Sequence, residues 1–285
     1  MNSWGYNMDF IKMHGAGNDY IYIDCFKENV ENPKALAKKL SPYRYGVGSD
    51  GIVLIMPSKK AHCFMDIYNK DGTRGKMCGN AVRCVASYMH RYTVNSAEIT
   101  VDTLSGVKNV KVFPKTQKED FCVVNMGEPI LSGHQIPTRF GDSIVKGKTL
   151  KILNREYKIT CVSMGNPHCV IFLDSHRELY SLNLEKIGPH FENHEMFPEG
   201  INTEFCHIID ENHIEMRVWE RGSGETYACG TGACAVCVAS IINGFSKEDE
   251  NIEIIAKGGT LCTNWQKNNT VTLMGNAVEV YRGKI

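Results

Sequence analysis

A four-residue pattern that begins with Cys-Gly occurs twice in this chain of 285 residues, and its two copies lie half a chain apart. The first copy is Cys78-Gly79-Asn80-Ala81 and the second is Cys229-Gly230-Thr231-Gly232, an offset of 151 residues. The same offset aligns other apolar positions, for example Met65 with Met216. A constant offset near half the chain length indicates two similar domains.

Each half shows the same local order around its Cys-Gly pair. A strand-like run comes first, at 64–68 and at 214–219, and a polar loop containing glycine leads from it to the cysteine. Apolar helices are expected directly afterwards, at 81–89 and 233–242, and Arg83 is their single charged residue. A helix that is apolar all round has to be buried all round.

The rest of the chain is rich in strand-like runs. They lie at 21–23, 52–55, 99–101, 107–113, 121–124, 159–162, 169–173, 252–255 and 271–274. With the two buried helices, they predict an α+β fold of two similar domains, each a curved, mostly antiparallel sheet wrapped round a central helix. The expected domains are 8–127 with the C-terminal strand 276–285, and 128–275. Residues 1–7 are expected to be a disordered extension.

Composition excludes several classes of function. Apolar residues make up 42% of the chain and charged residues 22%, the balance of a soluble globular protein. Lysine plus arginine equals aspartate plus glutamate, so we expect no recruitment by nucleic acid or by an anionic membrane. The first ten residues lack the apolar core of a secretory signal, and the longest apolar stretch, 228–242, is shorter than the roughly 20 residues of a membrane span. We therefore expect a cytoplasmic protein.

The chain has twelve cysteines, which is high for its length. Without a secretory signal, most are expected to be buried thiols that behave as small apolar side chains. Cys234 and Cys237 form a CxxC pattern, but the chain contains no second one, and their spacing fits the buried face of an apolar helix. We therefore expect no metal site.

Cys78 and Cys229 stand apart because each comes directly before a predicted buried helix. The free N–H groups and the positive end of the dipole at a helix start favour a thiolate and a bound anion. Gly79 and Gly230 allow a ligand to approach the backbone closely. Two such thiols are expected to face one another across the domain cleft. That arrangement inverts a stereocentre without metal or pyridoxal phosphate, because one thiolate removes the Cα proton while the opposite thiol delivers another.

Several separated motifs match, in order, those of one known family. They are HGAGND at 14–19, GVGSDG at 46–51, NKDGT at 69–73 followed by CGN at 78–80, MGNPH at 164–168, NT at 202–203, and ERGSGET at 220–226 leading into ACGTG at 228–232. On these motifs the chain resembles diaminopimelate epimerases from about Met8 to its C-terminus. The resemblance implies a diaminopimelate epimerase-like fold. It also implies an isomerase that interconverts LL- and meso-diaminopimelate for lysine and peptidoglycan-precursor biosynthesis, with no cofactor.

The resemblance also implies roles for individual residues. Cys78 and Cys229 match the two acid/base cysteines, and His168 and Glu220 match a polar pair that flanks the reacting centre. The matched donors to the reacting carboxylate are Gly79, Asn80, Gly230 and Thr231. The matched residues that hold the substrate, chiefly at its distal end, are Asn18, Asn69, Asn166, Asn202 and Arg221.

Two positions depart from the family pattern. Gly51 stands where some members carry a glutamine that contacts the substrate, so no contact is expected there. Thr73 replaces a commoner serine, which is a minor change.

Two alternatives stay open. The first is another cofactor-independent racemase or epimerase, acting on proline, hydroxyproline or histidine; the asparagine and arginine set argues instead for a substrate with a second amino-acid end. The second is a redox or metal-binding cysteine protein without turnover. The expected partner is a small-molecule substrate, and the oligomeric state stays open, with a homodimer as one option.

Overall fold

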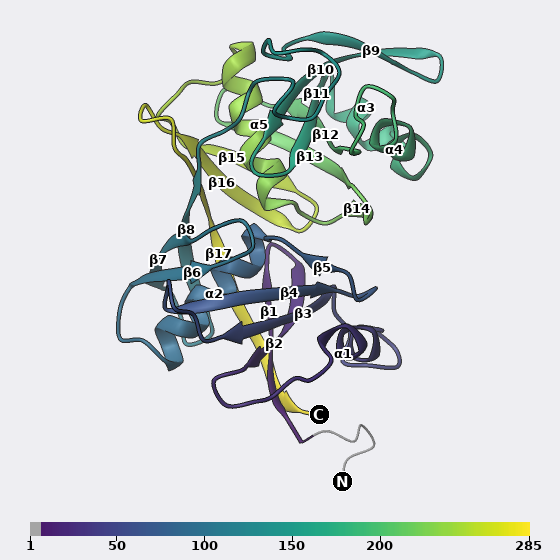
Figure 1. Cartoon of the computed structure of the whole chain (residues 1–285). Helices are drawn as coiled ribbons and strands as arrows, with labels where there is room; N and C mark the ends of the chain where they lie inside the picture. The colour runs from purple at the N-terminus through teal and green to yellow at the C-terminus, as the bar shows by residue number, and fades with distance from the viewer. Residues whose placement is uncertain (1–6) are drawn as a thin grey trace. The chain divides into compact units, whose positions relative to one another are not determined.

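The computed structural model describes residues 7–285, which divide into two compact units (Figure 1). Unit 1 comprises the chain up to Val124 together with Met274–Ile285, and unit 2 comprises Asn125–Leu273. The chain leaves unit 1 within strand β8 and returns to it within strand β17. The expected disordered extension, residues 1–7, lies outside the described residues except for Asn7, which is exposed and belongs to no helix or strand.

Unit 1 is a closed barrel of strands with two helices. Its elements are β1 (Asp9–Gly15), β2 (Asn18–Asp24), α1 (Pro33–Leu40), β3 (Gly51–Met56), β4 (Cys63–Asn69), β5 (Arg74–Gly75), α2 (Gly79–Tyr92), β6 (Glu98–Asp102), β7 (Lys108–Pro114), β8 (Glu119–Gly127) and β17 (Val271–Lys284). Pairing runs in the order β17, β1, β2, β3, β4, β6, β7 and β8, and β8 pairs with β17 to close the ring.

Helix α2 supplies much of the interior of unit 1. All its residues from Gly79 to Met89 are buried, and it packs against β1, β2, β4, β6 and β7. Its basic residues lie in different environments: Arg83 is fully buried, whereas Arg91 in the last turn bonds the carboxylate of Asp120 on β8. Burial of the apolar side chains from Ala81 to Met89 is the main stabilising contribution of this helix.

Unit 2 contains the remaining elements. They are β9 (Lys148–Ile152), β10 (Arg155–Ser163), β11 (Pro167–Leu173), α3 (His176–Ser181), α4 (Leu184–Glu192), β12 (Asn202–Ile208), β13 (His213–Glu220), β14 (Gly224–Thr226), α5 (Gly230–Asn243), β15 (Ile252–Ala256) and β16 (Gly259–Trp265). Pairing runs β9, β10, β11, β12, β13, β15 and β16, and β14 forms a short hairpin with β13.

Helix α5 is buried from Gly230 to Ser240 and packs against β10, β11, β12, β15 and β16. Helix α4 adds Phe191 to a separate core cluster that also contains Phe205 and Trp219. Gly188 of α4 lies so close to Trp219 that a Cβ atom there would come within 2.2 Å of the indole ring. Helix α4 thus packs against both β12 and β13, whereas α5 packs against β12.

The architecture is sheet-rich with few helices and with mixed strand pairing. The pairs β2–β3, β4–β6, β11–β12 and β13–β15 are parallel, whereas the other pairs with a defined register are antiparallel. The two helices expected at 81–89 and 233–242 lie within α2 and α5, which begin directly after Cys78 and Cys229. Each of the nine further runs expected as strands overlaps an observed strand.

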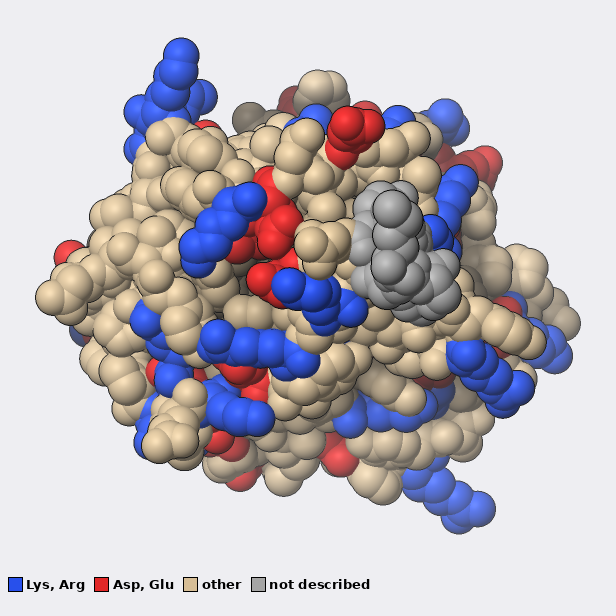
Figure 2. All heavy atoms as spheres, turned by 90° about the horizontal axis from the view of Figure 1, so that it is seen from below, with Lys and Arg blue, Asp and Glu red and all other residues tan. Residues whose placement is uncertain are grey.

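Basic and acidic side chains are interspersed on the face of the molecule seen in Figure 2, where red groups are bordered by blue ones. This agrees with the balanced composition of the chain. No helix within residues 7–285 is both long enough and apolar enough to cross a membrane.

We expect Asp120→Ala to lower the free energy of unfolding by about 3 kcal/mol, because it removes a fully buried carboxylate that accepts from Ser87 and from two nitrogens of Arg91, whose remaining acceptors are backbone carbonyls. Urea denaturation followed by circular dichroism measures this loss. Glu119→Ala on the same strand is the control, since its pair with Lys115 is exposed and contributes less than about 1 kcal/mol. Equal losses in both variants would contradict this account of α2.

Candidate active site

The two cysteines singled out by the sequence repeat occupy the same position in their units: each is the N-cap of a buried helix. Cys78 has φ −139° and ψ 119°, and its sulfur accepts the N–H of Ala81 at 3.5 Å. Cys229 has φ −118° and ψ 115°, and its sulfur accepts the N–H of Gly232 at 3.4 Å. A sulfur in the N-cap position satisfies one of the free N–H groups of the first turn. Both sulfur atoms are therefore fixed at the positive end of a helix.

In unit 1, Cys78 lies in a small network of amide side chains. Its thiol is 3.3 Å from Oδ1 of Asn18, which is also 3.4 Å from Nδ2 of Asn80. The Nδ2 group of Asn18 donates to Asp50 at 2.8 Å. The structure thus brings together three residues that the sequence assigned to the site, from the start of β2 and from the start of α2.

Arg83 supports this network from inside the unit. Its guanidinium donates to Oδ1 of Asn80 at 2.9 Å, to the carbonyl of Gly79 at 3.1 Å and to the carbonyl of Asn276 at 3.4 Å. No carboxylate pairs with it among the residues that the structure describes. Burial lowers the pKa of Arg83, and the nearby thiols, including that of Cys78, act in the opposite direction. Arg83 therefore orients Asn80 and places a buried cation in the first turn of α2.

In unit 2, His168 connects two polar side chains. Its Nδ1 lies 2.7 Å from Oε1 of Glu204, and its Nε2 lies 3.1 Å from Oδ1 of Asn166. The side chains of His168 and Glu204 are fully buried on the parallel strands β11 and β12. One ligand atom each of His168, Glu204 and Cys229 lie within 4.8 Å of one another, so this trio could hold a metal ion. The short N···O contact is that of a hydrogen bond, which accounts for two of these atoms without an ion.

Glu220 is a further carboxyl near Cys229. The hydroxyl of Thr226 donates to Oε1 of Glu220 at 2.5 Å. Burial raises the pKa of the Glu220 carboxyl, and hydrogen bonds from Thr226 and Cys229 together with the ring of His168 oppose this rise. A carboxyl in this position can accept a hydrogen bond from the Cys229 thiol.

The environment of Cys229 corrects one expectation drawn from the sequence. We expected its helix start to favour the thiolate, yet the pKa of Cys229 is raised well above its ordinary value. Burial is the largest cause, followed by the charges of Glu220 and Glu204, whereas Thr231 and the N–H of Gly232 act the other way. Desolvation and two neighbouring carboxyls therefore outweigh the helix terminus in their effect on the pKa of Cys229.

Other expected site residues are engaged in local hydrogen bonds. Asn69 donates to Thr73 at 3.0 Å within the loop after β4. Asn202 donates to the carbonyl of Pro167 at 2.8 Å and accepts the N–H of Arg221 at 3.0 Å, so it joins β11 to the loop after β13. Arg221 is exposed and donates to the carbonyl of Glu199 at 2.6 Å.

Gly51 has a physical reason to differ from glutamine. A Cβ atom at Gly51 would lie 2.0 Å from the carbonyl oxygen of Tyr68 on the neighbouring strand β4. No side chain fits there unless the backbone shifts, so this departure from the family pattern is built into the pairing of β3 with β4.

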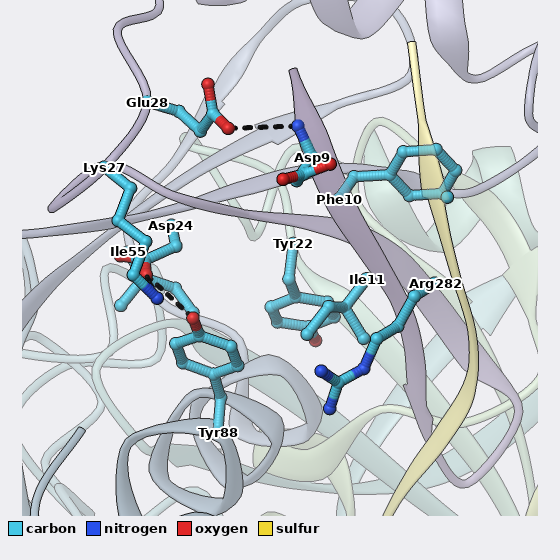
Figure 3. Close-up of a pocket in the computed structure, with 11 residues that line it drawn as sticks. Asp9, Phe10, Ile11, Tyr22, Asp24, Lys27, Glu28, Ile55, Tyr88 and Arg282 are labelled. Atoms are coloured by element: carbon cyan, nitrogen blue, oxygen red, sulfur yellow. Dashed lines mark hydrogen bonds and ion pairs between the residues drawn. The ribbon is translucent and has the colours of Figure 1, made fainter. Parts of the chain in front are cut away.

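A surface cavity of about 360 Å³ lies elsewhere in unit 1 (Figure 3). None of the site residues expected from the sequence lines it. Its polar groups engage one another: the hydroxyl of Tyr88 donates to Asp24 at 2.8 Å, and the N–H of Asp9 donates to Glu28 at 3.1 Å. The cavity therefore gives no reason to move the candidate site away from the helix starts.

Comparison with known proteins assigns the family. The family model described as diaminopimelate epimerase matches residues 10–132 and 160–280. The chain belongs to the diaminopimelate epimerase family. It is 48% identical over 280 residues to the diaminopimelate epimerase of Acetivibrio thermocellus, covering 98% of each chain. It is 42% identical over 280 residues to that of Methanococcus maripaludis strain C5, covering 98% of this chain and 99% of the relative.

Solved structures with the same fold are more distant in sequence. A PhzF-family phenazine biosynthesis protein of Bacillus anthracis superposes with a TM-score of 0.70 at 14% identity, covering 98% of this chain and 99% of that one. A probable proline racemase of Agrobacterium radiobacter K84 gives 0.71 at 12% identity, covering 98% and 92%. At these identities the likeness establishes the fold.

Sequence reasoning missed Glu204 and gave Arg83 and Asp50 no role in the site. Glu204 was detectable in principle, because a charged residue interrupts the otherwise uncharged run Asn202–Cys206 just after a family motif. Arg83 carried a similar signal as the single charge in an apolar helix. A single charge in an apolar segment points to a functional role only when the residues around it are known to be buried.

We expect Glu220→Gln to lower the pH at which Cys229 reacts with iodoacetamide, because it removes a negative charge that raises the pKa of this thiol. Peptide mass spectrometry across a pH series gives the half-reaction pH for Cys229. Glu225→Gln is the control, since this carboxylate on the adjacent β14 bonds Arg217 and is not among the charges that act on Cys229. A pH profile unchanged by Glu220→Gln would contradict this explanation.

Proposed function

We propose that this isomerase interconverts LL-2,6-diaminopimelate and meso-diaminopimelate, on the route to lysine and peptidoglycan precursors. Membership of the family and 48% identity to a named diaminopimelate epimerase support this activity. The observation that carries the chemistry is the matched pair of sulfur atoms, Cys78 and Cys229, each held as N-cap acceptor of a buried helix.

The proposed mechanism is proton transfer by two bases at Cα. One cysteine, as thiolate, removes the α-proton, and the other, as thiol, delivers a proton to the opposite face of the same carbon. Proton and charge balance, because the thiolate becomes a thiol while the thiol becomes a thiolate. The scheme requires that the two sulfurs reach opposite faces of one substrate carbon, and each unit contributes one of them.

The surroundings of the cysteines support an assignment of which cysteine is the thiol and which is the base in the resting enzyme. Cys229 is the thiol, because burial and the carboxyls of Glu220 and Glu204 disfavour its thiolate. The scheme then gives Cys78 the role of the base, and the buried cation of Arg83 bonds the Gly79 carbonyl and the Asn80 side chain at the start of the helix that Cys78 caps. The N–H groups at both helix starts, around Gly79, Asn80, Gly230 and Thr231, hold the reacting carboxylate, where negative charge develops as the proton leaves.

The remaining family positions bind the rest of the substrate. His168 and Glu220 flank the reacting centre, and Asn18, Asn69, Asn166, Asn202 and Arg221 hold the substrate, chiefly its distal amino-acid end. Amide groups can serve both an ammonium and a carboxylate, and an arginine can bind a carboxylate with two hydrogen bonds. The exposed Arg221 is bonded to a loop carbonyl here and would exchange that partner for the substrate.

The proposal also covers the domain organisation, location and assembly of the protein. We propose that the two units descend from an internal repeat, each a sheet curved round its buried helix, with boundaries at 8–127 plus 276–285 and at 128–275. The burial of α2 and α5 and their identical capping by cysteine support this. The mechanism calls for no metal or organic cofactor, and we propose a cytoplasmic enzyme that assembles as a homodimer.

Cys78→Ala and Cys229→Ala are each expected to lower epimerisation of LL-diaminopimelate by at least about 1,000-fold, because each face of Cα needs its own proton carrier. Proton NMR in heavy water, without added cofactor, follows α-hydrogen exchange and the appearance of the meso isomer. Cys25→Ser is the control, since Cys25 lies just after β2 and is not among the residues proposed to act.

Two results would overturn the proposal. Near-normal epimerisation by either alanine variant would exclude the two-thiol mechanism. Turnover of proline, hydroxyproline or histidine, but not of diaminopimelate, in a substrate panel would exclude the proposed substrate and place the enzyme among other racemases of this fold.

A further inference from the structure

Glu204 is a buried carboxylate to which no substrate-binding or proton-transfer role has been assigned. It lies in the middle of β12, and its side chain is fully excluded from solvent. Oε1 lies 2.7 Å from Nδ1 of His168, whereas Oε2 has no hydrogen-bond partner in the described part of the chain. An unpaired carboxylate oxygen in the interior is unfavourable by a few kcal/mol, so its retention calls for a reason.

The surroundings of Glu204 place it beside the reacting groups. Parallel pairing sets His168 of β11 opposite Asn202 of β12, and Glu204 follows two residues later on the same face of the strand. A Cβ atom at Gly232 would lie 2.5 Å from Oε1 of Glu204 and 3.2 Å from the Cβ of Cys229. The carboxylate therefore occupies the space between His168 and the first turn of α5, and that space exists because residue 232 is a glycine.

The fold alone does not demand a carboxylate in this strand. At the offset of 151 residues, position 204 corresponds to position 53, since 204 − 151 = 53. That residue is Val53, which is buried in β3 and pairs with β2 and β4. A buried strand of this kind thus accepts an apolar side chain at the equivalent place, and the charge at Glu204 serves something other than packing.

We propose that Glu204 is a positioning residue that holds a proton on Nδ1 of His168 and so presents the Nε2 edge of the ring to the reacting centre. An ionised carboxylate can only accept hydrogen bonds, so at 2.7 Å the proton of this contact lies on Nδ1. The ring is then held at both nitrogens: Nδ1 donates to Glu204, and Nε2 donates to Oδ1 of Asn166, because an amide oxygen only accepts. The inference rests on the proposed function only for the statement that His168 flanks the substrate.

Glutamine at position 204 tests the role of the charge with little change of shape. Glu204→Gln keeps an acceptor oxygen but can also turn an N–H towards Nδ1, which favours a ring that carries its proton on Nε2 alone. We expect kcat for epimerisation to fall by at least about 10-fold with little change in KM, as for other carboxylates that orient a functional histidine. Glu204→Val, the residue found at the equivalent position, removes the acceptor altogether and should lower kcat at least as much.

Nitrogen-15 NMR of histidine-labelled protein reads the tautomer directly and does not depend on turnover. A His168→Gln variant identifies the signals of this ring. In the parent enzyme we expect a protonated Nδ1, and in Glu204→Gln a changed protonation pattern of the ring. Glu215→Gln is the matched control, because Glu215 on β13 bonds Nδ1 of His176 at 2.9 Å on the surface. The control should leave both kcat and the His168 signals unchanged.

The outcomes separate this inference from the proposed function. An unprotonated Nδ1 in the parent enzyme overturns the inference even if neither variant of Glu204 folds. An unchanged ring signal together with unchanged kcat in Glu204→Gln overturns it as well. The third outcome is a parent enzyme that has no epimerase activity but has the expected proton on Nδ1, with that signal changed in Glu204→Gln. This result supports the positioning role and refutes the proposed function.

Discussion

The capping of a buried helix by a cysteine sulfur is the interaction on which the proposed chemistry of both units depends. Cys78 and Cys229 each accept the N–H of the third helical residue, at 3.5 and 3.4 Å. Because α2 and α5 are buried and pack against several strands, neither helix start can shift without disturbing the core of its unit. The position of each sulfur is therefore set by the packing of a whole helix and not by a mobile loop. A reacting group held in this way gains precision that a loop residue would lack.

Cys78 and Cys229 occupy the same N-cap position, but the charged groups around them have opposite signs. Near Cys78, Arg83 is a buried cation whose hydrogen-bond partners are neutral oxygens. Around Cys229 lie the carboxyls of Glu220 and Glu204, which add to burial in raising the pKa of the thiol. A helix terminus is equivalent to about half a unit charge, so a nearby full charge or complete desolvation outweighs it. Cysteines in the same cap position can thus have different electrostatic surroundings, and the difference resides in residues outside the Cys-Gly pair.

Local sequence signals predicted two of the five helices in the described residues, α2 and α5, and most strands, because burial on every side leaves a clear apolar pattern in 81–89 and 233–242. They failed where contacts between residues far apart in the sequence determine the structure. The helix α1 (Pro33–Leu40) has only eight residues, too few for a clear helical period, and β12 contains Asn202 and Glu204 among buried neighbours. The caps at Cys78 and Cys229 follow from one Cys-Gly pair each. The raised pKa of Cys229, in contrast, depends on strands β12 and β13 meeting α5, which no window of sequence contains.

The unequal surroundings of the two thiols matter for the completion of a catalytic cycle. In the proposed scheme, inversion leaves Cys78 protonated and Cys229 as thiolate, which is the less stable of the two enzyme forms. A thiolate with a raised pKa is a strong base, so in this scheme Cys229 recovers its proton readily once product has left. The enzyme therefore returns to its starting form without needing the reverse reaction. In this scheme the buried carboxyls near Cys229 oppose its ionisation and so favour a return to the starting form between successive turnovers. The equivalent cap positions of the two cysteines allow epimerisation in both directions.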